Sequence, residues 1–150
     1  MELKRRFVLI AIGVCFIAAH SFGAEDMRQA APELVAGQVW SLRGDAPGAT
    51  AIILKVETVP NLGKLVHIMV RGAALPSPNG EIGHLPLTEA AFTRSAIAVV
   101  GVSTDAPDLS GYEVWKAAFD DGRAGAFTVD VAQAIEFVRN ALARQGGGSA

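Results

Sequence analysis

The chain has 150 residues, with 15 acidic against 13 basic side chains and a formal net charge of −2. This balance argues against a nucleic-acid-binding protein, which usually presents a basic face to phosphate groups. The single cysteine, Cys15, has no partner for a disulfide within the chain, so a folded domain must be stabilised by its hydrophobic core.

The first 24 residues have the order of a secretory signal peptide. A basic cluster at residues 4–6 precedes an apolar run at residues 7–19, and small residues follow up to Ala24. The apolar run has 13 residues, whereas a membrane-spanning helix needs about 20. This favours a cleaved leader over an uncleaved anchor. We predict cleavage between Ser21 and Ala24, and we set aside a lipid anchor on Cys15 because Val14 directly before it is not small.

Removal of the leader changes what the rest of the chain can do. Ten basic and fourteen acidic residues remain, for a net charge of about −4, and no cysteine is left. Thiol chemistry is thereby excluded, and attraction to an anionic membrane surface is disfavoured. We expect a periplasmic or secreted protein without a stable membrane anchor, in which residues 25–145 form one globular domain and residues 146–150 a flexible tail.

Three strands are predicted in the first half of this domain, at residues 38–43, 50–57 and 64–71. Turn-forming residues at 45–48 and 60–63 separate them, which is typical of an antiparallel meander. In the second strand, alternation predicts that Ile52, Leu54 and Val56 share one face. The third strand is apolar on both faces, and this predicts a central position.

The second half alternates between loops, helices and strands. Residues 72–87 are predicted to form a loop because they are rich in proline and glycine. A helix over residues 89–95 capped by Thr88 follows. The apolar run at 96–102 has the length of a strand, with continuation of the helix as the alternative. Capping boxes at Ser110 and Asp130 predict helices to Asp121 and to about Arg144, with a short strand at 125–129 between them.

These elements predict an α+β fold. We expect an antiparallel β-meander, either as a strongly bent sheet or as a partial barrel, with two to three helices packed on one face. Strands and helices do not alternate in the first half, which argues against a doubly wound parallel sheet.

Two histidines remain after the leader, and they are the candidate chemical groups. His67 lies in the third predicted strand, where a hydrogen-bonded structural role is the commoner case. His84 lies in a loop bracketed by Gly83 and Pro86, and loops on a rigid scaffold often carry function. No His-x-x-x-His or Cys-x-x-Cys spacing is present, so no metal site is predicted.

The other candidates are weaker. Ser103 follows an apolar strand like the nucleophile of a hydrolase elbow, but the second glycine of that motif is absent, so we interpret Ser103 and Asp105 as turn formers. No glycine loop for phosphate is present, and no cofactor is predicted. Trp40 is a candidate binding residue that could line a ligand groove, although aromatic residues at such positions more often lie in the core.

Several segments together resemble a group of small uncharacterised exported bacterial proteins. They are residues 37–41 (GQVWS), 65–68 (LVHI) and 82–86 (IGHLP), with Gly111-Tyr112, Trp115 and residues 125–128. The resemblance implies no activity and assigns no catalytic residue. It does imply that the two histidines and Trp40 belong to one pattern.

The leading hypothesis is therefore an exported binding or interaction protein, motivated by the leader and by the lack of a recognisable catalytic set. A variant is an inhibitor or immunity protein whose partner is a periplasmic or extracellular protein. The alternative is a hydrolase that uses His84 with a carboxylate. That alternative requires His84 to converge with His67 or with an acidic side chain, since a general base acts within hydrogen-bond reach.

Overall fold

The computed structural model describes residues 32–44, 48–75, 77 and 79–146. The predicted leader with its cleavage site, most of the predicted turn at residues 45–48, and the tail beyond residue 146 lie outside the described residues. The described residues from Glu33 onward belong to one compact unit. None of the helices in the described segments has the length and apolar character that crossing a membrane requires.

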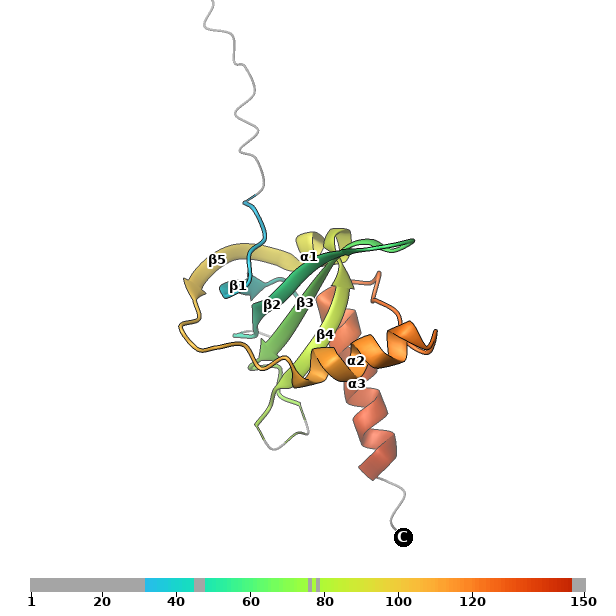
Figure 1. Ribbon diagram of the computed structural model, residues 1–150. Helices are drawn as coiled ribbons and strands as arrows, with labels where there is room; N and C mark the ends of the chain where they lie inside the picture. The colour runs from blue at the N-terminus through green and yellow to red at the C-terminus, as the bar shows by residue number, and fades with distance from the viewer. Residues whose placement is uncertain (1–31, 45–47, 76, 78, 147–150) are drawn as a thin grey trace, which may run out of the picture. The chain divides into compact units, whose positions relative to one another are not determined.

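A five-stranded antiparallel sheet forms the centre of this unit (Figure 1). Its strands are β1 (Gln38–Leu42), β2 (Thr50–Val59), β3 (Gly63–Arg71), β4 (Ile82–Thr88) and β5 (Ala96–Val102). The spatial order is β4-β3-β2-β1-β5, so the first four strands form a meander and β5 returns to lie beside β1. The predicted α+β meander is confirmed, and the third strand is indeed internal.

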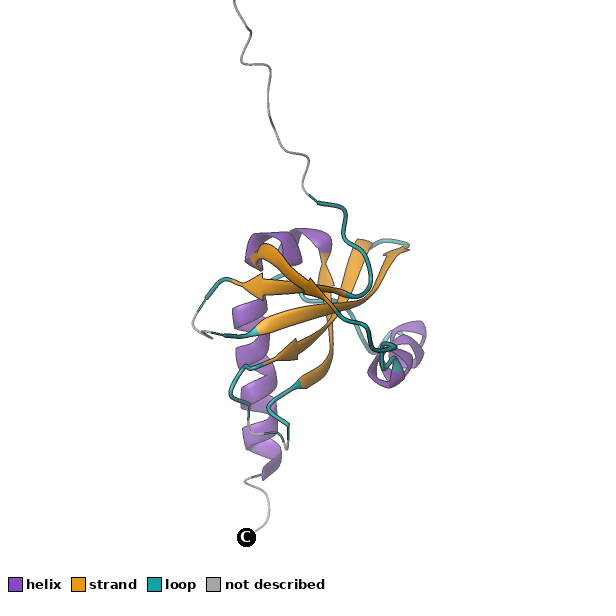
Figure 2. Ribbon diagram, turned by 90° about the vertical axis from the view of Figure 1, so that its left-hand side faces the viewer, coloured by secondary structure: helices purple, strands orange, loops and turns teal. Residues whose placement is uncertain are grey.

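Three helices accompany the sheet: α1 (Glu89–Ser95), α2 (Ser110–Asp120) and α3 (Val131–Gly146). Two of them, α1 and α3, share one face of the sheet as expected, whereas α2 covers the opposite face (Figure 2). Two separate hydrophobic clusters reflect this arrangement. Phe92 of α1 and Ile135 of α3 belong to the larger cluster, and Trp115 of α2 belongs to the smaller one.

The segment with the fourth strand was predicted as a loop, and this prediction is wrong. Pro86 favours a loop in the sequence because it has no N–H to donate to a ladder. In the structure Pro86 lies opposite His67 of β3, and its carbonyl oxygen accepts the N–H of Phe127 on the other side at 2.9 Å. The predicted strand at 125–129 is correspondingly reduced to one parallel bridge between Leu87 and Phe127.

The predicted capping box at Ser110 is wrong. Helix α2 begins at Ser110 with Leu109 as its N-cap, and no side chain bonds at that cap. The carboxylate of Asp108 instead accepts the N–H of Ser110 at 2.9 Å. At the start of α3, the carboxylate of Asp130 accepts a hydrogen bond from Arg94, and the hydroxyl of Ser95 accepts the N–H of Val131.

A β-bulge in β2 changes which side chains face which cluster. The pairing of β2 with β3 slips between Ile53 and Lys55, so one additional residue is inserted in β2. Ile53 belongs to the larger cluster and Val56 packs against it, whereas Lys55 lies directly opposite His67. The prediction that Ile52, Leu54 and Val56 share a face is therefore wrong, because the inserted residue reverses the alternation.

Candidate functional site

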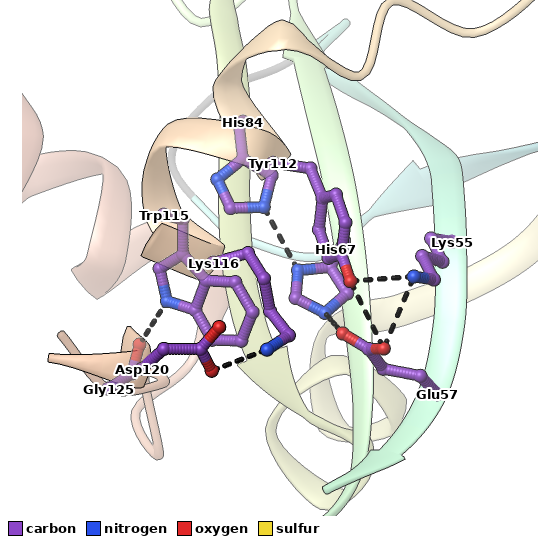
Figure 3. A network of polar contacts seen from close by, with 9 residues as sticks. All are labelled: Lys55, Glu57, His67, His84, Tyr112, Trp115, Lys116, Asp120 and Gly125. Atoms are coloured by element: carbon purple, nitrogen blue, oxygen red, sulfur yellow. Dashed lines mark hydrogen bonds and ion pairs between the residues drawn. The ribbon is translucent and has the colours of Figure 1, made fainter. Parts of the chain in front are cut away.

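Five side chains form a polar network between the sheet and α2: Lys55, Glu57, His67, His84 and Tyr112 (Figure 3). Nδ1 of His67 lies 2.9 Å from Nε2 of His84, and Nε2 of His67 lies 3.1 Å from a carboxylate oxygen of Glu57. The two imidazole planes differ by 15°, and Figure 3 shows the rings end to end. The structure thus brings both predicted histidines together with a carboxylate that the sequence analysis did not identify.

The carboxylate fixes the direction of the hydrogen bonds. Glu57 can only accept when ionised, so Nε2 of His67 donates to it and Nδ1 of neutral His67 accepts from Nε2 of His84. Nδ1 of His84 is then an acceptor. It has no hydrogen-bond partner in the described part of the chain, where every fully buried side-chain nitrogen or oxygen has one, so this atom is not fully buried.

The other oxygen of Glu57 is held at the surface end of the network. Nζ of Lys55 lies 3.2 Å from this oxygen and donates to the hydroxyl of Tyr112 at 2.6 Å. The same hydroxyl donates to Glu57 at 3.2 Å, so the three groups form a closed triangle. Nζ of Lys55 also lies 4.1 Å from the centre of the Tyr112 ring, where a cation is attracted by the ring face.

Helix α2 encloses the network with its aromatic residues. The ring centres of Tyr112 and Trp115 lie 5.0 and 4.7 Å from that of His67, which is fully buried. Nε1 of Trp115 donates to the carbonyl oxygen of Gly125 at 2.8 Å, and this fixes the orientation of the indole. At Gly111 the helix approaches the sheet so closely that a Cβ atom would lie 2.6 Å from Cβ of His84. Only glycine therefore fits at this position without a steric clash.

Burial sets the protonation states of the histidines. Desolvation lowers the pKa of His67 below its ordinary value, although the neighbouring Glu57 opposes this shift. Desolvation and the proximity of His67 lower the pKa of His84 to about 4. Both imidazoles are consequently neutral at pH 7, which agrees with the donor and acceptor directions derived above.

The charged pair at the surface end is stabilised in its ionised form. Desolvation raises the pKa of Glu57, but hydrogen bonds from Lys55 and Tyr112 outweigh it and hold that pKa below its usual range. The hydrogen bond to Tyr112, followed by the interactions with Glu57, raises the pKa of Lys55. The network therefore contains one negative and one positive charge and two neutral rings at neutral pH.

The network is not arranged as a metal centre. Within the described ranges, no group of three or more His, Cys, Asp or Glu side chains could hold a metal ion. Both ring nitrogens of His67 are already engaged in hydrogen bonds. Of the four imidazole nitrogens, only Nδ1 of His84 offers a free lone pair, and one ligand does not make a site.

Trp40, the third predicted site residue, lies elsewhere. Its side chain is 5% exposed and belongs to the larger cluster on the face covered by α1 and α3. The indole packs edge-on against Phe92 with ring centres 5.7 Å apart, and its N–H donates to the side chain of Gln38. The structure does not bring Trp40 to the histidines.

A pocket of about 350 Å³ opens on the same face of the sheet as the polar network. Ile52, Leu54 and Met69 supply apolar lining from β2 and β3, and the connection over residues 103–108 lies along it. The backbone holds this connection in place, because Ser103 donates its N–H to the carbonyl oxygen of Gly37 at 2.8 Å. From the sequence, Ser103 and Asp105 are interpreted only as turn formers.

The charged groups of the pocket are mostly acidic. Arg71 is paired with Glu81 at 2.9 Å, so its charge is largely balanced. Asp105 and Asp108 also line the pocket, and neither has a cationic partner within the described ranges. The N–H of Ser110 lowers the pKa of Asp108, which keeps this carboxylate ionised. The pocket thus combines apolar lining with two negative charges.

Comparison with models of protein families, with curated proteins and with solved structures finds no match to this chain.

Proposed function

We propose that this protein is an exported binding protein whose pocket takes a small apolar molecule bearing a cationic amine. The observation that carries the proposal is the pocket itself, where Asp105 and Asp108 stand beside an apolar lining. Its volume of about 350 Å³ is at the lower end of the range for small-molecule sites.

Each part of the pocket has a role in this proposal. Contact with Ile52, Leu54 and Met69 removes the apolar part of the ligand from water, which provides most of the binding free energy. The carboxylates then select for positive charge. Since Asp105 and Asp108 are both exposed, their attraction to an amine is weakened by salt. We therefore expect affinity to arise mainly from the apolar contacts and selectivity from the two aspartates.

Isothermal titration with phenethylamine and its neutral analogue phenethyl alcohol tests this proposal. The amine is expected to bind several-fold more tightly at low salt, and the preference is expected to disappear in the Asp105→Asn/Asp108→Asn variant. Asparagine retains the oxygen that accepts the N–H of Ser110. The matched control is Glu113→Gln, an exposed acidic residue of α2 that does not line the pocket. Equal affinity for both compounds, or a preference unchanged in the aspartate variant, would refute the proposal.

Export is the second part of the proposal, and the order of charged, apolar and small residues in the first 24 positions supports it. Fractionation of the producing cell followed by mass determination of the chain tests it directly. We expect the protein outside the cytoplasm, with Phe22, Gly23 or Ala24 as its new first residue. A full-length chain in the cytoplasm would contradict export.

A hydrolase is a second candidate function, favoured by the convergence of His84, His67 and Glu57. In this reaction Nδ1 of His84 accepts a proton from water while the water oxygen attacks an ester carbonyl. The proton passes to the departing alcohol as the C–O bond breaks. Release of p-nitrophenol from p-nitrophenyl acetate should then fall at least tenfold in His84→Gln. An equal rate in that variant would exclude this function.

A further inference from the structure

The edge strand β5 exposes an uncharged apolar surface. Four large apolar side chains of this strand, Ile97, Val99, Val100 and Val102, are between 42% and 70% exposed. The strand contains neither a charged residue nor a proline. Native proteins usually protect exposed edge strands with such residues, because an unprotected edge is a template for pairing with another strand.

One side of β5 is available for such pairing. The strand pairs with β1, and no other strand in the described part of the chain pairs with it. Two irregularities in register between β1 and β5 bend the strand, yet its apolar side chains remain open to solvent. Figure 1 shows β5 curving along the outside of the sheet.

We propose that β5 pairs antiparallel with β5 of a second copy of this chain, forming a two-fold symmetric dimer with a continuous sheet. A strand paired antiparallel with itself satisfies the two-fold symmetry that is commonest among oligomers. Pairing centred on Val99 places Ala96 of one copy opposite Val102 of the other. No like charges meet along the strand, because residues 96–102 carry none.

Charges at the ends of β5 favour a second copy as the partner and an antiparallel orientation of the two strands. Arg94 precedes the strand and Asp105 follows it, and both are exposed; Arg94 also bonds Asp130 at 3.0 Å, yet its side chain remains 52% exposed. Antiparallel pairing brings the beginning of one strand near the end of the other, so opposite charges approach each other twice. Parallel pairing would bring Arg94 near Arg94 and Asp105 near Asp105, which is unfavourable.

Analytical ultracentrifugation of the protein, purified from the compartment to which the cell delivers it, tests the dimer. At tens of micromolar we expect the mass of two copies for the natural sequence and of one copy for Val100→Lys. The matched control is Val114→Lys, since Val114 is 73% exposed on α2 away from β5. This control should remain dimeric. A single-copy mass for the natural protein, or a dimer that persists in Val100→Lys, would overturn the proposal.

Further measurements distinguish pairing through β5 from association through a different surface. Asp105→Asn should weaken dimerisation several-fold at low salt, whereas Asp108→Asn should leave it unchanged. Amide hydrogens of β5 should exchange slowly in concentrated protein and quickly on dilution. This measurement needs no substitution, so the proposal stays testable if Val100→Lys fails to fold. Exchange that is independent of concentration, or a different protein bound stoichiometrically at β5, would refute the self-pairing.

Discussion

Nδ1 of His67 and Nε2 of His84 lie 2.9 Å apart, although 17 positions of sequence separate the two residues. Neighbouring strands β3 and β4 bring them together, and Glu57 of β2 fixes the direction of the hydrogen bond from the far side of His67. This chain of groups joins the sheet to α2. Its titration and its removal therefore have measurable consequences for stability.

The histidines should make the protein less stable in acid. Their pKa values are lowered in the folded state, that of His84 from 6.5 to about 4, so the unfolded chain binds more protons between these values. The free energy of unfolding is therefore highest above pH 6.5 and decreases as the pH falls towards 4. For His84 we expect a loss of about 2 kcal/mol, less than the full shift gives, because the ring is partly open to solvent. Urea unfolding at several pH values measures it.

The control for this pH dependence is His84→Gln. Glutamine does not titrate, so the free energy of unfolding should change less between pH 6.5 and 5 in this variant. Glu57 does not interfere in this range, because its lowered pKa makes its contribution disappear only below about pH 4.5. A pH dependence identical to that of the natural sequence would contradict the assignment to His84.

Replacing His67 by leucine should destabilise the protein by about 2–3 kcal/mol at pH 7. The substitution leaves Nε2 of His84 and one oxygen of Glu57 without partners in a partly buried site. Chemical unfolding measures the change. Lys116→Gln is the surface control and should change stability by less than about 0.5 kcal/mol. A stable His67→Leu variant would show that the network contributes little.

Gly111→Ala should destabilise the protein by about 1–3 kcal/mol, although alanine is a better helix former than glycine. The reason is the 2.6 Å approach that a Cβ atom would make to Cβ of His84. In a His84→Gly background that contact is absent, so the same substitution should cost less or should stabilise. A double-mutant cycle measures this coupling, and additive effects would contradict the close approach.

Trp40→Phe should lower stability by about 1–2 kcal/mol without changing the pH dependence, because Trp40 packs in the other cluster. Unfolding at pH 7.5 and at pH 5 measures both effects. A changed pH dependence would indicate that Trp40 and the histidines act together, as the sequence resemblance implied.

The meander and the helices follow from periodicity and turn residues, but the polar network could not be predicted fully. Unbroken alternation along β2 would have placed Glu57 on the face of Ile53, away from His67. The bulge between Ile53 and Lys55 reverses the alternation and brings Glu57 to the histidine face. Local composition around this bulge gives no sign of it, because an inserted residue is recognised only against its partner strand.

The fourth strand shows a second limit of prediction from the sequence. Gly83 and Pro86 are typical of a loop, and only the pairing with β3 and the bridge at Phe127 makes residues 82–88 a strand. His84 was identified as a candidate for its place beside these residues. His67 of β3 was also identified, but Glu57 of β2 and Tyr112 of α2 were not, because their approach to the histidines depends on tertiary packing.

Mapping of backbone amide resonances during titration with phenethylamine tests most directly whether the pocket beside residues 103–108 binds an apolar amine. We predict saturable shifts at Ile52, Met69 and the residues of 103–108 other than Pro107, which has no amide hydrogen, with weaker shifts for phenethyl alcohol. Shifts confined to His84 and α2, or no saturable shifts at millimolar amine, would contradict the claim.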